Sequence, residues 1–138
     1  MKYGTALARV LLVDDDPTSR LTLQTVLEAG GYSVDSAASA AEAVGKLDQE
    51  QYELVLSDLR MESPEAGLKV LAHARMMEYQ PATALITAYH NAVKRAETLR
   101  SLLIQPEDVP ALLTKVADLI SGRAARRLER QMRHHAGA

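Results

Sequence analysis

The sequence predicts an α/β fold, a doubly wound five-stranded parallel sheet with helices on both faces, in a single domain. Short apolar runs that end in polar residues, as at 10–13 and 54–57, are typical of strands buried on both faces. Between them apolar residues recur at helical spacing, so strands and helices alternate. The 138 residues are 47% hydrophobic, enough for one domain with a core and too few for two comfortable ones.

Composition and charge exclude several classes of function. The formal net charge of -2 argues against a surface that binds nucleic acid generally, and the absence of cysteine excludes disulfides and thiolate metal sites. Arg9 and the acids at 14–16 leave only short apolar runs near the N-terminus, so we expect no signal peptide. No apolar run approaches the length that spans a membrane. We therefore expect a cytoplasmic protein without a membrane partner.

Three acids separate the first strand from the first helix. Residues 10–13 form the strand, and Pro17 suits the first turn of a helix for which Asp16 is a possible N-cap. Gly30 and Gly31 then end this helix. Its inner stripe consists of Leu23, Val26, Leu27 and Gly30.

The next strand and helix repeat this order. A short strand covers residues 32–37. Ser39 and Glu42 have the spacing of a capping box, which predicts that a helix opens here and runs to about residue 49.

The third and fourth strands both end at a polar side chain. Residues 54–57 are followed by the carboxylate of Asp58, and the strand over 83–87 ends at the hydroxyl of Thr87. Between them, a loop containing Pro64 leads to a helix over 67–77. The side chains of that helix expected to face inward are Leu68, Leu71 and Ala72.

The C-terminal part of the predicted domain is less regular. We assign residues 89–100, which are polar with scattered apolar positions, to a helix, and residues 101–104 to the fifth strand. Gln105 and Pro106 follow. The last helix is clearer because one apolar stripe runs along it, made of Val109, Leu112, Leu113, Val116, Leu119 and Ile120.

A basic segment follows the predicted domain, which we place at residues 1–121. Residues 122–138 form a basic helical C-terminal extension or tail with five arginines and two histidines. Gly122 is a possible helix stop, yet no breaker follows up to His135, and Ala124, Leu128 and Met132 recur at four-residue intervals. A solvated helical extension, a frayed end, a partner contact and a linker to another domain remain alternatives.

Polar side chains from three strands should meet at one edge of the sheet, because the carboxyl ends of parallel strands lie together. Asp14 and Asp15 follow the first strand, Asp58 the third and Thr87 the fourth. Acids at about 5 Å repel by roughly 3 kcal/mol at an effective dielectric of about 20, which suggests a cation. Oxygen ligands suit Mg²⁺ or Ca²⁺. With a cation bound, Asp58 can serve as ligand and nucleophile, and Thr87 can donate to a phosphoryl oxygen.

These motifs resemble the receiver domain of bacterial two-component response regulators, over about residues 8–120. Residues 11–17 look like the first-strand motif of that family, 54–61 like its phosphoacceptor motif, and 85–88 like the segment with the switch hydroxyl. The resemblance implies a flavodoxin-like receiver fold. It also implies a phosphoacceptor protein rather than an enzyme, with only intrinsic autophosphorylation and dephosphorylation.

The resemblance implies a set of site residues. Asp58 would accept the phosphoryl group, and Mg²⁺ would be held by Asp14, Asp15, Asp58 and the backbone carbonyl of Arg60. Thr87 and Ala88 would form the switch segment that binds the phosphoryl group.

Two positions depart from the pattern of the family. Gln105 stands where receiver domains normally have a lysine before a proline, so it would face the phosphoryl group as a neutral amide. An amide cannot supply a charge-assisted hydrogen bond, which predicts weaker phosphoryl binding and weaker coupling to the switch. Leu102 occupies the aromatic switch position and leaves Thr87 without its usual rotamer partner.

The implied partners are a sensor histidine kinase or phosphotransfer protein and a downstream protein, with a second copy in a homodimer as a further candidate. We expect no nucleic-acid partner unless an output domain is missing from the chain.

Two alternatives remain. The first is a receiver-like interaction module that no longer depends on phosphorylation, which the glutamine at 105 favours and the intact acids oppose. The second is a phosphatase resembling the haloacid dehalogenases, because residues 14–18 fit a D-x-D-x-T motif with Asp14 as nucleophile. That alternative gives Asp58 no role, and after Thr87 no apolar run ends in the acids that it would need.

Overall fold

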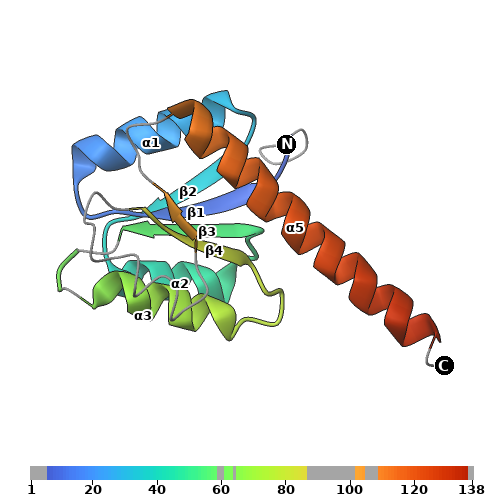
Figure 1. Ribbon diagram of the computed structural model, residues 1–138. Helices are drawn as coiled ribbons and strands as arrows, with labels where there is room; N and C mark the ends of the chain where they lie inside the picture. The colour runs from blue at the N-terminus through green and yellow to red at the C-terminus, as the bar shows by residue number, and fades with distance from the viewer. Residues whose placement is uncertain (1–5, 59–60, 64, 87–101, 105–108, 137–138) are drawn as a thin grey trace.

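A five-stranded parallel sheet forms the centre of the protein, in the strand order β2-β1-β3-β4-β5 (Figure 1). The computed structural model describes residues 6–58, 61–63, 65–86, 102–104 and 109–136. The strands are β1 (Arg9–Val13), β2 (Ser33–Ala37), β3 (Leu54–Asp58), β4 (Ala82–Ile86) and β5 (Leu102–Ile104). The predicted doubly wound α/β class is confirmed.

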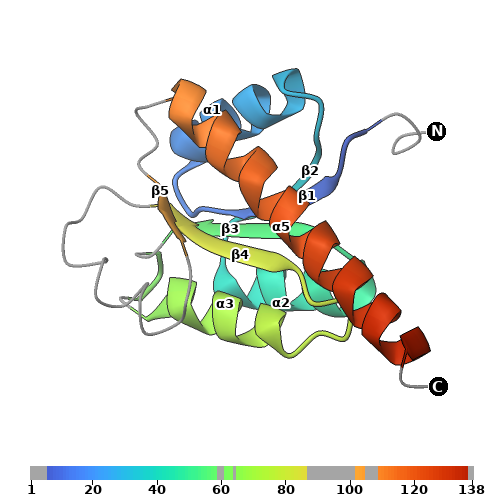
Figure 2. The ribbon, with the colours of Figure 1, turned by 45° about the vertical axis from the view of Figure 1, so that its right-hand side comes forward.

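Helices cover both faces of this sheet. They are α1 (Pro17–Ala29), α2 (Ala40–Gln49), α3 (Ala66–Arg75) and α5 (Val109–Ala136). Figures 1 and 2 show α1 and α5 on one face and α2 and α3 on the other. The helix predicted over residues 89–100 lies outside the described residues.

The side chains of β1 alternate between two cores, one on each face of the sheet. Val10 and Leu12 pack in the core under α1 and α5, with Leu27 and Leu112 among their neighbours. Leu11 and Val13 pack in the core under α2 and α3. Because successive strand residues point to opposite faces, a strand covered on both sides must be apolar throughout. Each fully buried Leu stabilises the fold by roughly 1.5–3 kcal/mol.

The predicted helix starts are formed by side-chain caps. Asp16 accepts a hydrogen bond from the Ser19 backbone N–H at 3.3 Å, and Ser39 Oγ accepts from the Glu42 N–H at 3.1 Å. The Glu42 carboxylate reaches back to the N–H of Ala38 at 3.1 Å. In a standard capping box this second bond goes to the N-cap residue itself, so the reciprocal bond here lies one residue earlier.

The inner face of α3 differs from the prediction. Val70, Leu71 and Ala74 are buried, Leu68 is partly buried, and Ala72 is exposed. The predicted inward position of Ala72 is therefore wrong. The apolar residues of this helix fit more than one stripe, and the larger side chain of Val70 buries more surface than that of Ala72.

The last helix continues beyond the sheet. α5 passes through Gly122 without a break and ends at Ala136, and its C-terminal half extends away from the body of the protein (Figure 1). Two apolar side chains of the extension face solvent, since Leu128 is 57% and Met132 is 63% exposed. None of the described helices combines the length and apolar character needed to cross a membrane.

Candidate functional site

The candidate site lies where the connections of the sheet change direction. β1 stands between β2 and β3, so the chain leaves β1 toward α1 on one face and leaves β3 toward α3 on the other. Ligand crevices in open α/β sheets form at such switch points, outside the carboxyl ends of the strands. The register pairs Val13 with Ser57, which places the next residues, Asp14 and Asp58, side by side.

Three carboxylates meet at this point. Asp14, Asp15 and Asp58 each offer an oxygen, and these oxygens all lie within 4.8 Å of one another. Asp14 is only 3% exposed, Asp15 is exposed and Asp58 is intermediate. The structure therefore brings together the three acids that the sequence predicts, with Asp14 buried, Asp58 partly exposed and Asp15 exposed.

Backbone hydrogen bonds fix the position of Asp14. Its N–H donates to the carbonyl of Ala37 on β2 at 3.0 Å, and its Oδ1 accepts from the Asp16 N–H at 3.0 Å. Asp16 itself is used as the N-cap of α1. Because the N-terminus of a helix carries a partial positive charge, the start of α1 partly offsets the negative charge of these acids.

Arg20 belongs to the site and was not predicted from the sequence. Its Nη1 donates to the backbone carbonyl of Asp14 at 2.8 Å, which brings a cation to the edge of the carboxylate cluster. The position of Arg20 near the start of α1 was the one signal in the sequence, because the start of this helix faces the end of β1. The arginine side chain is long, so the sequence did not determine which group it would contact.

Four of the other predicted site residues, Arg60, Thr87, Ala88 and Gln105, lie outside the described residues. Leu102 is the first residue of β5, and its backbone pairs with Ala84 of β4.

This arrangement suits a divalent cation. Three negative charges within 4.8 Å repel one another, and a cation between them removes that repulsion. The donor set consists of hard oxygens, which suits Mg²⁺ or Ca²⁺ rather than a metal that prefers sulfur or nitrogen. A carboxylate beside such a cation can also act as a nucleophile toward phosphorus.

Comparisons with known proteins agree with this geometry. The family model of the response regulator receiver domain matches residues 10–104. The transcriptional regulatory protein GlrR of Escherichia coli is 34% identical over 118 residues, which cover 82% of this chain and 26% of that protein. The alginate biosynthesis transcriptional regulatory protein AlgB of Pseudomonas aeruginosa is 39% identical over 88 residues, covering 64% of this chain and 19% of that protein. The chain thus spans about a quarter or less of these curated relatives.

Solved structures share the fold. The response regulator protein TrrA from Thermotoga maritima, in complex with Mg²⁺-BeF, has a TM-score of 0.73 at 29% identity, over 82% of this chain and 99% of that chain. A response regulator receiver domain protein from Methanospirillum hungatei has a TM-score of 0.73 at 24% identity, covering 88% and 99% of the two chains. The matching family model, the curated relatives and the shared fold show that this chain belongs to the response regulator receiver domain family of two-component systems.

Proposed function

We propose that the protein accepts a phosphoryl group on Asp58 in a two-component phosphorelay, with Mg²⁺ bound beside it. The donor is the phosphohistidine of a sensor histidine kinase or of a phosphotransfer protein. The observation that carries this proposal is the meeting of three carboxylates, from two neighbouring strand ends, within 4.8 Å. Asp58 is the one of the three that β3 itself carries, and it is partly open to solvent.

Asp14, Asp15 and Asp58 fit a magnesium ion through their oxygen donors, and the backbone carbonyl of Arg60 is the further ligand that we expect. The bound ion would neutralise charge on the transferring phosphoryl group and hold its geometry. The likeness to TrrA, whose structure contains Mg²⁺-BeF, supports this assignment.

The nucleophile in the transfer is the carboxylate of Asp58. One of its oxygens forms a bond to phosphorus while the P–N bond of the phosphohistidine breaks. The imidazole nitrogen keeps the bonding electron pair, so no further reactant is needed. Asp14 is buried and hydrogen-bonded through the Asp16 N–H, so it stays in place during the transfer.

After transfer, Thr87 and Ala88 would contact the phosphoryl group and change the shape of the adjacent surface. Gln105 would weaken this coupling, because its amide has no positive charge. The altered surface would contact a downstream protein or a second copy of the chain. The relatives named as transcriptional regulators are much longer than this chain, and in a polypeptide of that length the altered surface would act on an output domain of the same molecule.

A second candidate is a receiver fold that works without phosphorylation. Gln105 in place of the usual lysine is the observation that favours it. The two candidates differ in one property, the uptake of a phosphoryl group that depends on magnesium.

The test is the intact mass of the full chain after incubation with acetyl phosphate and Mg²⁺. We expect wild type to gain one phosphoryl group, and Asp58→Asn to gain none. Asp48→Asn is the matched control, because Asp48 is an exposed acid on α2 that pairs with His73 and lies outside the cluster. It should be modified like wild type.

Omission of Mg²⁺ should abolish the gain in mass. If folded wild type gains no phosphoryl group while another receiver domain does so in parallel, the phosphorylation-independent module is the better description. Circular dichroism of each variant establishes that it is folded.

A further inference from the structure

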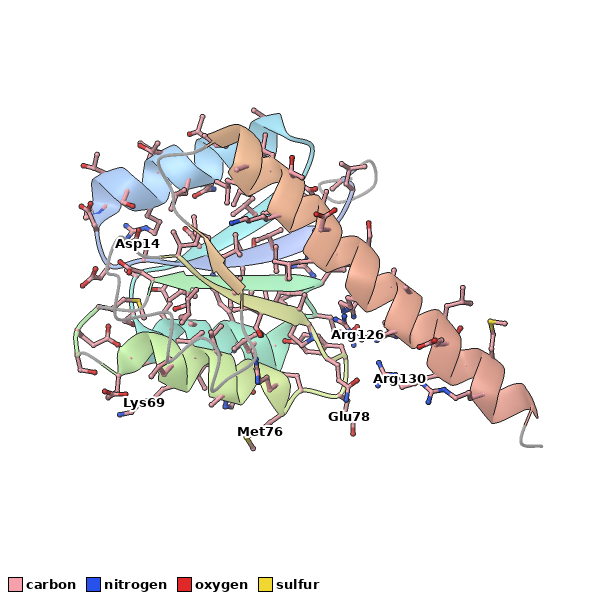
Figure 3. The ribbon with its side chains drawn as sticks, in the orientation of Figure 1. Asp14, Lys69, Met76, Glu78, Arg126 and Arg130 are labelled. Carbon is pink, nitrogen blue, oxygen red and sulfur yellow. The ribbon has the colours of Figure 1, made fainter. Side chains whose placement is uncertain are left out.

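A cavity lined by arginines lies at the end of the sheet opposite the carboxylate cluster. It is open to solvent and has a volume of about 630 Å³. We call it the arginine pocket, and its cations are Arg75 at the end of α3 and Arg123, Arg126 and Arg130 on α5. Ala82, the first residue of β4, lies on its floor, whereas Asp58 lies at the other end of the neighbouring strand. Figure 3 shows Asp14 far from Arg126 and Arg130.

The charge of this pocket is of one sign. Among the described residues that line it there is no carboxylate. Glu78 lies in the turn that follows α3, but it lines a different groove, between α2 and the end of α3. The remaining wall is neutral, with an apolar floor made of Pro81, Ala82 and Leu119.

Three arginines of α5 hold the loop that forms one wall of the pocket. Arg127 Nη1 donates to the backbone carbonyl of Tyr79 at 3.1 Å. Arg123 donates to the backbone carbonyls of Tyr79 at 2.7 Å and of Gln80 at 3.0 Å. Arg130 donates to the side-chain oxygen of Gln80. Gln80 has a φ of 43°, a left-handed conformation that costs a residue other than glycine roughly 1–2 kcal/mol. These contacts hold the loop in that conformation, so the wall is formed before any ligand arrives.

The arginines are crowded enough to repel one another. Burial lowers the pKa of Arg123, and the neighbouring charge of Arg127 lowers that pKa further. Glu53 opposes this effect, while Arg126 and Arg130 add to it. A multiply charged anion in the pocket would relieve this repulsion.

Arg126 is available to a ligand. Within the part of the chain that the structure describes, no hydrogen bond or ion pair engages its side chain. Its guanidinium lies over Gly122, where a Cβ would approach Nη1 to 3.3 Å. Glycine therefore leaves room for this side chain to lie back along the helix beside the pocket.

We propose that the arginine pocket binds a small organic anion that carries two phosphate groups or a diphosphate. Each phosphate carries a charge of about -1.5 to -2, so a ligand with two phosphates brings about three to four negative charges to the guanidinium groups of the pocket. Guanidinium groups match phosphate oxygens in bidentate pairs. The volume is in the range of small-molecule sites, roughly 300–1,000 Å³, and the apolar floor accommodates an organic group.

The test is isothermal titration of the full chain with ADP and with pyrophosphate, in a buffer containing EDTA. EDTA removes divalent cations, so the carboxylate cluster cannot attract the probe. Arg126→Gln removes one charge from the pocket. Arg133→Gln is the matched control, because Arg133 lies on the same helix, is exposed, pairs with Glu129 and does not line the pocket. Phosphoryl uptake at Asp58 is measured separately, so failure here is independent of that function.

We expect both probes to bind wild type at one site, ADP more tightly because of the apolar floor. Arg126→Gln should weaken binding about tenfold, which is the loss of one charge-assisted hydrogen bond. Arg133→Gln should bind like wild type. An equal loss in Arg133→Gln would show diffuse attraction to a basic helix and overturn the proposal. Absence of binding to both probes would also overturn it, as would binding of a glutamate-rich peptide in their place.

Discussion

At the scale of single residues, three neighbouring acids have three environments. Asp14 is buried and accepts a hydrogen bond from the Asp16 N–H, Asp15 is exposed, and Asp16 caps α1. The sequence predicted the meeting of Asp14 and Asp15 with Asp58, because strand ends in a parallel sheet are fixed by the alternation of elements. It did not predict Arg20, because the direction of a long side chain depends on packing around it.

The carboxylate cluster should cost stability when no cation is bound. Asp15→Asn removes one of three charges that lie within 4.8 Å of one another. We expect this change to raise the free energy of unfolding by about 1 kcal/mol without Mg²⁺, since the exposed acid is screened by water. Urea unfolding of wild type and of Asp15→Asn, with and without Mg²⁺, measures this difference in the free energy of unfolding.

Magnesium should stabilise wild type by mass action, and it should stabilise Asp15→Asn much less. An equal shift in both proteins would mean that the ion binds elsewhere. Asp48→Asn serves as the control, because it removes an acid outside the cluster.

A second residue, Tyr79, makes the free energy of unfolding depend on pH in the alkaline range. Burial raises the pKa of Tyr79 to about 12, with a further contribution from Asp48. Its hydroxyl donates to the carbonyl of Leu47 at 2.9 Å. The folded state therefore favours the protonated phenol of Tyr79. Its contribution to the free energy of unfolding is complete below the ordinary pKa of 10.0 and is lost as the pH rises through about 12.

Tyr79→Phe tests this dependence, because phenylalanine cannot ionise. The difference in unfolding free energy between wild type and Tyr79→Phe should shrink as the pH rises above 10.0. Comparison of the two proteins cancels the effect of Tyr52, whose pKa is also raised, mainly by burial. A difference that stays constant with pH would show that the pKa of Tyr79 is the same in the folded and unfolded states.

At the scale of elements, the caps were predictable and the orientation of α3 was not. Asp16 and Ser39 are local signals, and both form the expected hydrogen bonds. α3 begins after Glu65, which makes no side-chain cap bond, so no local signal fixes where the helix starts. Its inner face is then decided by packing against α2 and the sheet, which buries Val70 and leaves Ala72 exposed.

The length of α5 depends on contacts as well as on propensity. Gly122 lies inside the helix, where glycine costs about 1 kcal/mol relative to alanine. The next residue, Arg123, donates to Tyr79 and Gln80 and so ties this turn to the loop before β4. Gly122 was a possible stop in the sequence, and these contacts explain why the helix continues through it.

Gly122→Ala should therefore strengthen the C-terminal half of α5. The new Cβ meets only the flexible end of Arg126, which can move. We expect helix opening at residues 123–133 to become less favourable by about 0.5–1 kcal/mol, measured by slower amide hydrogen exchange. Exchange in β1, none of whose atoms lies within 4 Å of the new Cβ, is the internal control. Unchanged or faster exchange at 123–133 would contradict the prediction.

At the scale of the whole molecule, the two ends of the sheet have different chemistry. The carboxyl ends of β1 and β3 carry the acid cluster. Near the amino ends, Arg9 pairs with Asp35 and with Glu50, each at 3.1 Å, and the Tyr52 hydroxyl donates to Asp35 at 2.8 Å. The alternation of strands and helices predicted the parallel sheet. The arginine pocket was not predicted, because it joins Arg75 at the end of α3 to arginines of α5 that follow it by about fifty positions.

The most direct test of the proposed function is the position of the phosphoryl group. Borohydride converts a phosphorylated aspartate to homoserine, and trypsin then places Asp58 on the peptide 47–60 and Asp14 and Asp15 on the peptide 10–20. After treatment with acetyl phosphate and Mg²⁺, we expect homoserine at Asp58 alone. Homoserine at Asp14 would contradict the proposal and favour the phosphatase-like alternative, and homoserine at neither peptide would show that the protein accepts no phosphoryl group there.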